Sequence, residues 1–598
     1  MKLVCLALTT ALLAIGCSNL APALAPAPAA GTALHQPEGP SGVSTQPGWH
    51  GRRFAVATAH PLASEAGQQV LVAGGSAIDA AIAAQMVLTI VEPQSSGIGG
   101  GAFLLYHDGR ETVAFDGRET APAAAGETLL MRPDGKPMDF HDAVVGGRAV
   151  GVPGAVRMLE VAHARYGRLP WASLFEPAIR LADSGFPLGA RLYALLESDP
   201  HLRKDPGAAA YFYDPDGRAL ATGTLLRNPA LAAVLRLIAA EGSPALYQGE
   251  IAQAIVDKVA KHPYNPGTLS MADLTTYSPK ERTPLCTRYA SRTAEPARTY
   301  RICGFPPPSS GAVAIAQILG ILNHTEAPFL PFEDPRWMHF YSEASRLAFA
   351  DRAQYVADPD FVSAPAGDWL SLVRPDYLAA RARLIGPMSM QVARPGLPSP
   401  ERSSHAPMPE QAEYGTSHIS IVDAYGNALA MTSTIEDAFG ARQMVRGFLL
   451  NNELTDFSFT PTDASGAPVA NRVQPGKRPR SSMSPTLVFD DDTGELVMSG
   501  GSPGGALIIH YTAKLLYATL NWGFAPQQAI DLPNFGSLNG PTLLEEKRFP
   551  PAFVEALRAA GHEVKEVGMT SGVQAIRKDH GSYVGGADPR REGRVMGE

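Results

Sequence analysis

Residues 414–456 read YGTSHISIVDAYGNALAMTSTIEDAFGARQMVRGFLLNNELTD, and this stretch decides the fold prediction. Apolar and polar residues alternate through 418–423, a turn signal follows at Tyr425-Gly426-Asn427, and a second apolar run covers 428–434. Alternation on both sides of a Gly-Asn turn predicts an antiparallel hairpin. Thr416 stands at the start of its first strand.

Thr416 is a candidate nucleophile. A threonine hydroxyl needs a base beside it, usually a histidine, a lysine or the residue's own α-amine. The α-amine exists only if the Gly415–Thr416 bond is broken, and its reference pKa of about 7.7–8.0 suits a base near neutrality. A glycine before the bond permits the strained backbone that an N-to-O acyl shift requires. Taken alone, the Gly-Thr pair is also typical of an ordinary strand start.

Further motifs follow in a fixed order. They are TSTIE (432–436), LLNNELTDF (449–457), KRPRSSMSPT (477–486) and GSPGG (501–505), with VEPQSSGIGGG (91–101), DGRETAP (116–122) and PPPSSG (306–311) upstream and GGADPR (585–590) downstream. In this order they resemble the γ-glutamyltransferase (glutathione hydrolase) family of N-terminal-nucleophile hydrolases, over roughly residues 52–590. The resemblance implies an α+β fold, a four-layer αββα sandwich. It also implies a large subunit (49–415) and a small subunit (416–598) cut from one precursor, which remain together as an αβ heterodimer.

The resemblance assigns catalytic roles within the small subunit. Gly415–Thr416 is the cleavage site, and Thr416 is the nucleophile of the cut enzyme. The Thr434 hydroxyl hydrogen-bonds this nucleophile from the returning strand. Gly504 and Gly505 offer unshielded backbone N–H groups for the oxyanion of a tetrahedral intermediate; without the resemblance, these glycines predict only a tight turn before a helix at Ala506.

Substrate-binding residues are implied in the same way. Arg118 presents a planar fork of donors for an α-carboxylate, with Glu119 to orient it, although an Arg-Glu pair is also typical of a solvated surface. The matching serines for that carboxylate are Ser481 and Ser482. Three acids match the family's α-ammonium site, where asparagine and glutamine often replace the first two: Glu436, Glu453 and Asp456. Arg480 replaces a more familiar apolar residue, and it either adds a donor or faces solvent.

The implied function is cleavage of the γ-glutamyl amide of glutathione and related compounds. The glutamyl group then passes to water or to an amino-acid or dipeptide acceptor. Two alternatives stay open: a cephalosporin-acylase-like amidase on the same scaffold, and an uncut periplasmic binding lipoprotein. Composition is typical of a globular enzyme, with 45% hydrophobic and 18% charged residues, and a formal net charge of −8 argues against nucleic acid as a partner.

Other segments predict local structure. Residues 65–92 are helical and interrupted at Gly74-Gly75, and the following Gly-rich turn indicates close backbone packing before a strand at 102–106. Residues 155–410 read as mostly helical, notably 174–183, 230–240 and 337–350, and a helix runs from the 306–311 motif to Leu322. Residues 394–414 predict a mobile loop. The lid segment between Asp456 and Ser481 lacks tyrosine, which favours an open pocket.

The N-terminus predicts export. Residues 1–16 resemble a signal peptide of the lipoprotein type, which would leave Cys17 as a lipidated first residue; ordinary cleavage near residues 23–25 is the alternative. Residues 17–48 are rich in Ala and Pro and predict a disordered tether. The expected location is the periplasm, with possible anchoring to the bacterial outer membrane. There, Cys286 and Cys303 would form a disulfide, the alternative being two buried thiols, and no metal site is indicated.

Overall fold

The computed structural model describes residues 46–293, 297–400 and 403–598. The predicted signal peptide, Cys17 and residues 17–45 of the predicted tether lie outside the described residues. Every helix in the described ranges is too short or too polar to cross a bilayer.

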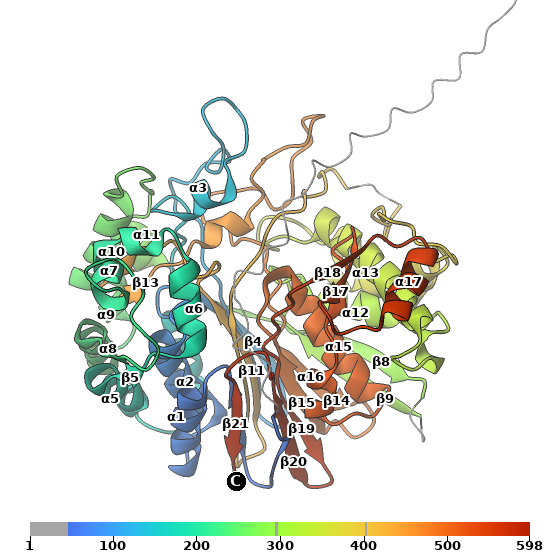
Figure 1. Ribbon diagram of the computed structural model, residues 1–598, viewed down its shortest axis with the longest axis horizontal. Helices are drawn as coiled ribbons and strands as arrows, with labels where there is room; N and C mark the ends of the chain where they lie inside the picture. Colours follow the sequence, from blue (N-terminus) through green and yellow to red (C-terminus); the bar gives the residue numbers. More distant parts are fainter. Residues whose placement is uncertain (1–45, 294–296, 401–402) are drawn as a thin grey trace, which may run out of the picture. The chain divides into compact units, whose positions relative to one another are not determined.

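Two seven-stranded sheets form the centre of the protein (Figure 1). In spatial order the first sheet contains β1 (Trp49–Gly51), β20 (Ser582–Ala587), β19 (Gln574–Asp579), β15 (Leu496–Gly501), β14 (Thr486–Asp490), β9 (Arg298–Gly304) and β8 (Leu285–Ser291). The second contains β21 (Arg594–Gly597), β2 (Ala55–Thr58), β10 (Ser417–Val422), β11 (Ala428–Thr434), β3 (Gly101–His107), β4 (Thr112–Gly117) and β7 (Lys280–Arg282). All neighbouring strands in both sheets are antiparallel.

Helices cover the outer face of each sheet, on opposite sides of the strands in Figure 1. On the side of the second sheet, α1 (Pro61–Val72), α2 (Ala77–Val91) and α4 (Ala155–Tyr166) contact its strands. The same hydrophobic cluster includes α5 (Glu176–Ser184), α6 (Ala190–Ser198), α7 (Pro206–Phe212), α8 (Pro229–Glu241), α9 (Pro244–Tyr247), α10 (Gly249–Ala260) and α11 (Met271–Thr276). Against the first pack α12 (Gly311–Leu322), α13 (Pro335–Tyr355), α14 (Pro375–Ala382), α15 (Ile508–Leu520), α16 (Pro526–Asp531) and α17 (Pro551–Ala559). Shorter elements complete the fold: α3 (Phe140–Val144), the pairs β5 (Phe186–Pro187) with β6 (Leu225–Leu226) and β12 (Met444–Val445) with β13 (Phe448–Leu449), and a small sheet of β16 (Phe535–Gly536), β17 (Thr542–Glu545) and β18 (Val564–Val567).

Alternation along the strands produces the layers. On β10, Ile419 and Ile421 point to the helices of the second sheet, whereas Ala428 and Ala430 of β11 point between the sheets, where they meet Leu487 of β14. Successive side chains of a strand face opposite sides, so each strand buries one row against helices and the other against the facing sheet. The order helix–sheet–sheet–helix agrees with the predicted αββα sandwich.

The predicted hairpin is present. β10 and β11 pair in antiparallel register, with Ser417 opposite Ser433, and the turn between them contains Gly426 at φ +86°. A positive φ is the conformation that glycine adopts without steric cost. The predicted helices around 65–92, 174–183, 230–240, 337–350 and 311–322 also match α1 with α2, α5, α8, α13 and α12.

Strands β8 and β9 were not predicted, because residues 155–410 read as mostly helical. Their apolar residues are spaced by arginines and threonines, so the alternating pattern of a half-buried strand is weak. Cys286 of β8 lies opposite Cys303 of β9, and the structure joins them by a disulfide.

The glycine run before β3 permits close contact with the hairpin. A Cβ built on Gly100 would stand 2.0 Å from the carbonyl oxygen of Thr434, and one on Gly99 would stand 2.1 Å from that of Leu449. These are backbone atoms of paired strands and of the segment that follows them, so they have little room to move. The close backbone packing predicted for this run is confirmed.

We predict that Gly100→Ala destabilises the protein, because the new methyl group overlaps the Thr434 carbonyl. Overpacking of this kind costs roughly 1–3 kcal/mol or more. Urea unfolding would measure it as a lower midpoint. Gly126→Ala is the control, since no atom lies within 4 Å of the new methyl group there. Equal midpoints for the two variants would contradict the packing argument.

Candidate active site

The Gly415–Thr416 peptide bond lies just before β10, beside the end of β11. In the intact chain the Thr434 hydroxyl donates a hydrogen bond to the Gly415 carbonyl oxygen, 2.6 Å away. The Gly504 backbone N–H donates to Thr416 Oγ1 at 3.2 Å, and Thr416 is only 3% exposed. Thr434 and Gly504, which lie 19 residues after Gly415 and 88 residues after Thr416, therefore meet at one peptide bond. The Thr434 hydroxyl was expected to hydrogen-bond the Thr416 hydroxyl, and in the intact chain it bonds the Gly415 carbonyl oxygen instead.

The Gly504-Gly505 turn requires glycine at both positions. Gly504 has φ +133° and Gly505 has φ +57°, both in the region that favours glycine. A Cβ on Gly505 would stand 1.9 Å from the carbonyl oxygen of Glu413. The segment that precedes the Gly415–Thr416 bond therefore lies directly on this turn.

His418 is the histidine nearest to Thr416 in the sequence. Its two ring nitrogens lie 2.8 Å from Thr432 Oγ1 and 3.1 Å from Ser420 Oγ. Burial lowers its pKa to about 3. Both nitrogens are thus engaged within the sheet, which favours the α-amine of Thr416 over His418 as the base.

Arg118 lies at the centre of a buried acid cluster. Its Nη1 contacts Glu453 and its Nη2 contacts Asp456, while Nε donates to the Pro479 carbonyl oxygen at 3.2 Å. Glu119 Oε2 stands 4.0 Å from Nη1. The donor fork predicted for a substrate carboxylate is therefore used for Glu453 and Asp456 in this structure.

Burial is the main cause of the pKa shifts of the acids in this cluster. It raises the pKa values of Glu453 and Asp456 well above their ordinary range, although the charge of Arg118 opposes the shift. Burial and the neighbouring carboxyl groups of Asp456 and Asp437 raise that of Glu436 in the same direction. Glu453 Oε2 and Asp456 Oδ1 are buried and accept no hydrogen bond. A cation at these oxygens would relieve the excess of acid.

The serine pair is positioned by the 306–311 segment. The Ser310 backbone N–H donates to the Ser481 carbonyl oxygen at 2.8 Å, and the Ser309 hydroxyl donates to the Met483 carbonyl oxygen at 2.7 Å. The sequence explained this segment as the start of α12, which it is. It also fixes Ser481 and Ser482 in the site.

Two residues of the site, Arg352 and Glu413, were not predicted. Arg352, in the last turn of α13, donates through Nη2 to Glu413 Oε1 at 2.6 Å and to Ser482 Oγ at 2.6 Å. Arg480 is 3% exposed and lies with Nη2 3.5 Å from the same Glu413 oxygen, so it does not face solvent. Glu413 is the third residue before Thr416, and that proximity to the predicted cleavage site is the one signal for Glu413 in the sequence.

The space at the site is small in the intact chain. A cavity of about 10 Å³ is lined by predicted residues of both subunits together with Glu413 and Tyr414. The Tyr414 backbone N–H donates to Glu436 Oε1 at 3.2 Å. The segment before the Gly415–Thr416 bond therefore fills the pocket that the sequence predicts to be open. The open pocket expected of a cut enzyme stays a prediction.

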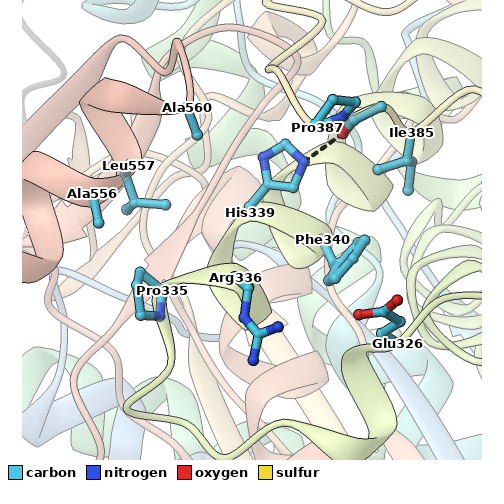
Figure 2. A pocket seen from close by; sticks show the side chains of 11 residues that line it. Glu326, Pro335, Arg336, His339, Phe340, Ile385, Pro387, Ala556, Leu557 and Ala560 are labelled. Carbon is cyan, nitrogen blue, oxygen red and sulfur yellow. Dashed lines mark hydrogen bonds between the residues drawn. The ribbon is translucent and has the colours of Figure 1, made fainter.

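A cavity of about 450 Å³ lies elsewhere, between α13 and α17 (Figure 2). It contains no predicted site residue. His339 on its wall approaches the Gly386 carbonyl oxygen at 2.8 Å and His562 at 2.8 Å. With Glu343 these histidines are close enough to share an ion, but the buried Arg346 guanidinium donates to Glu343 at 2.6 Å. The positive charge of Arg346 already neutralises Glu343, so we interpret the three residues as a hydrogen-bonded network and not as a metal site.

Solved structures share this arrangement. The cephalosporin acylase from Bacillus halodurans superposes with a TM-score of 0.79 at 27% identity, covering 93% of this chain and 97% of that one. With two stacked antiparallel sheets between helices, the chain has the N-terminal-nucleophile hydrolase fold.

Sequence comparison narrows the class. The family model described as Gamma-glutamyltranspeptidase matches residues 63–598. The Glutathione hydrolase proenzyme of Bacillus subtilis (strain 168) is 36% identical over 562 residues, 92% of each chain. The Acylase ACY 1 proenzyme of Pseudomonas sp. (strain V22) is also 36% identical, over 555 residues, 91% of this chain and 93% of that protein. The chain belongs to the gamma-glutamyltranspeptidase family and is an enzyme.

We predict a pH-dependent effect of Glu119→Gln on stability. Burial raises the pKa of Glu119 to about 7, against the attraction of Arg118. The folded protein thus holds a proton that the unfolded chain releases near pH 4.3, and the free energy of unfolding falls as pH rises through this window. Glutamine does not titrate, so it removes this dependence on pH. The free energy of unfolding of the variant, relative to wild type, should rise by up to about 3 kcal/mol between pH 4.5 and 8. Parallel pH profiles from urea unfolding would contradict the assignment.

Proposed function

We propose that the chain cuts itself between Gly415 and Thr416 and then acts as a γ-glutamyltransferase and glutathione hydrolase. The observation that carries this proposal is the meeting of Thr434, Gly504 and Thr416 at one peptide bond. A hydroxyl nucleophile, a donor to the carbonyl oxygen and a donor next to the nucleophile are the groups that acyl transfer requires.

In the self-cutting step, Thr416 Oγ1 attacks the Gly415 carbonyl carbon. The Thr434 hydroxyl donates to the carbonyl oxygen, which becomes the oxyanion. Collapse breaks the C–N bond, the nitrogen takes a proton, and an ester joins Gly415 to Thr416. Water then hydrolyses the ester to give the Gly415 carboxylate and restores the Thr416 hydroxyl beside a free α-amine.

In the cut enzyme, the α-amine of Thr416 acts as the base for its own hydroxyl. The hydroxyl attacks the γ-glutamyl carbonyl carbon, the N–H groups of Gly504 and Gly505 stabilise the oxyanion, and the amine leaves with a proton. The γ-glutamyl ester on Thr416 then reacts with water, or with the amino group of an amino acid or dipeptide. No step requires a cofactor.

Charges in the pocket suit an amino acid. The unpaired oxygens of Glu453 and Asp456, with Glu436 nearby, favour the α-ammonium. Ser481 and Ser482, with Arg118, are proposed to bind the α-carboxylate. A γ-glutamyl group carries both charges, and this is the reason to prefer it as the donor.

An acylase is the second candidate, because an acylase proenzyme is as similar to this chain as a glutathione hydrolase proenzyme is. Such an amidase would use the same threonine on an acyl group without the α-ammonium. The buried acids would then have no counter-charge in the substrate, and for this reason we rank it second.

The two cut chains would remain together. β10 and β11, which follow the cut, lie between β2 and β3, which precede it. In the other sheet, β14 and β20, which follow the cut, pair with β9 and β1, which precede it. Backbone hydrogen bonds in both sheets would therefore hold an αβ heterodimer. We also propose a periplasmic location, with Cys17 as lipid anchor to the outer membrane; labelling with a radioactive fatty acid, compared with Cys17→Ser, tests this.

We predict that Thr416→Ala leaves a single uncut chain, because alanine has no hydroxyl to attack Gly415. Thr416→Ser, which keeps a hydroxyl, is the matched control and should still be cut. A denaturing gel with N-terminal sequencing of the smaller fragment measures both. Two chains from Thr416→Ala would disprove the nucleophile, and an uncut wild type would favour a binding protein.

We predict that the cut wild-type protein releases p-nitroaniline from its γ-glutamyl derivative, faster when glycylglycine is present. Because the acid cluster favours an ammonium, the glutaryl derivative, which lacks only that group, should react at least tenfold more slowly. Initial rates of absorbance increase measure both. Faster release from the glutaryl compound would favour the acylase.

A further inference from the structure

Arg591 is a buried arginine that hydrogen-bonds the backbone of Thr416. It lies in the loop between β20 and β21 and is 2% exposed. Its Nη1 donates to the Thr416 carbonyl oxygen at 3.4 Å, and its Nη2 donates to the Thr570 carbonyl oxygen at 3.3 Å. A buried guanidinium group therefore lies directly beside the residue that we propose as the nucleophile.

The strand pairing explains why a side chain is needed at this carbonyl oxygen. β2 pairs with β10 from Ile419 to Val422, so Thr416 precedes the paired residues. A buried carbonyl oxygen without a strand partner requires a donor from elsewhere. Arg591 supplies this donor from the loop that leads out of the first sheet and into β21, the strand next to β2. The backbone of Thr416 is thus held by the last part of the chain.

Arg591 also packs against the segment that carries the Gly504 turn. A Cβ built on Gly572 would stand 2.8 Å from Arg591 Cδ and 2.6 Å from Pro503 Cγ, so the three residues are in close contact. Pro503 directly precedes Gly504, whose N–H donates to Thr416 Oγ1. One side chain therefore connects the backbone of the nucleophile with the turn that is proposed to bind the oxyanion.

The charge of Arg591 acts on the group that the cut creates. An α-amine works as a base only when it is neutral, and its reference pKa is about 7.7–8.0. A nearby cation disfavours the charged amine and so lowers its pKa. Arg591 Nη1 contacts the carbonyl oxygen of Thr416, and only three covalent bonds separate that oxygen from the nitrogen of the same residue.

The other ionisable groups around Thr416 belong to ion pairs or are neutral. In the intact chain the pairs are Glu92 with Arg191, Asp588 with Arg590, Arg118 with Glu453 and Asp456, and Glu413 with Arg352 and Arg480. Burial lowers the pKa of His418 and raises the pKa values of Glu436 and Tyr511, so it favours the neutral form of each. Arg591 differs from these groups because it contacts the Thr416 backbone itself.

We propose that Arg591 is a positioning residue for the nucleophile of the cut enzyme. It holds the Thr416 carbonyl oxygen beside the Gly504 turn, and its positive charge keeps the new α-amine neutral, so that the amine can act as the base. The inference rests on the proposed function and deepens it. Because the self-cutting step involves no α-amine, the charge of Arg591 matters for turnover and not for the cut.

Labelling of the α-amine tests the inference without any turnover. Acetic anhydride reacts with neutral amines, so the pH dependence of acetylation at the N-terminus of the small subunit, followed by mass spectrometry, gives the pKa of the Thr416 α-amine. In the cut wild type, this pKa should lie below the reference value of about 7.7–8.0. Arg591→Met, which keeps a long side chain without charge, should raise it by about one pH unit, and Arg591→Lys should not.

Arg577→Met is the matched control, because Arg577 Nη1 also donates to a backbone carbonyl oxygen, that of Phe524. It should leave the pKa of the α-amine unchanged. Arg591→Gln keeps N–H donors and removes the charge, so it covers the case in which Arg591→Met does not fold. Both neutral variants should still be cut. An α-amine pKa equal to that of wild type, or loss of the cut in both, would overturn the inference.

Kinetics then separate this inference from the proposed function. The acidic limb of the kcat/KM profile for γ-glutamyl p-nitroanilide should move up by about one pH unit in Arg591→Met and return in Arg591→Lys. A profile that falls in height and does not move along the pH axis would show a structural effect alone and would overturn the role of the charge. A cut wild type that turns over no γ-glutamyl compound would overturn the proposed function, while the labelling result would still decide the role of Arg591.

Discussion

The backbone hydrogen bonds that insert β10 and β11 between β2 and β3 are the constraint on which the site depends. They place the Gly415–Thr416 bond at the end of a central strand, where neither neighbour can move away. Thr434 reaches the bond only because the hairpin register brings the end of β11 beside the start of β10. The Gly504 turn follows β15 in the chain, and it reaches the bond only because β15 of the facing sheet packs on the same two strands.

Buried charge is the second organising feature. The acid cluster contains Glu436, Glu453 and Asp456 around one arginine, Arg118. Beside it, two arginines, Arg352 and Arg480, lie around one acid, Glu413. Such separation is costly in a folded interior unless a ligand with both charges completes it. The arrangement matches an amino-acid group, with ammonium and carboxylate on one carbon. In the intact chain, Glu413 supplies only the carboxylate.

The sequence was sufficient for local structure and insufficient for charge pairing. Alternation around Tyr425-Gly426-Asn427 predicted the hairpin, and apolar periodicity predicted α5, α8 and α13, because those patterns depend on neighbours in the chain. The pairing of Arg118 with Glu453 was not predictable from either residue. Arg118 lies near several acids, and only the fold decides which of them its guanidinium contacts. Arg352 and Glu413 were missed because an arginine in the last turn of a helix and a glutamate in a loop are ordinary surface residues. β8 and β9 were missed because arginines and threonines interrupt their apolar residues, so neither strand shows a clear alternation.

Because strands of the two parts are interleaved, the proposed mature enzyme can form only from a chain that folded before it was cut. The intact chain folds as one molecule, and its strands find each other at the high effective concentration of a single polypeptide. After the cut, β2 lies between two strands of the other chain, β10 and β21. Unfolding would then release two polypeptides that must meet again in solution and interdigitate in two sheets. The activation barrier to unfolding would preserve the active form, which would lack a direct route to reassembly. Its lifetime would therefore be set by the rate of unfolding and not by an equilibrium free energy.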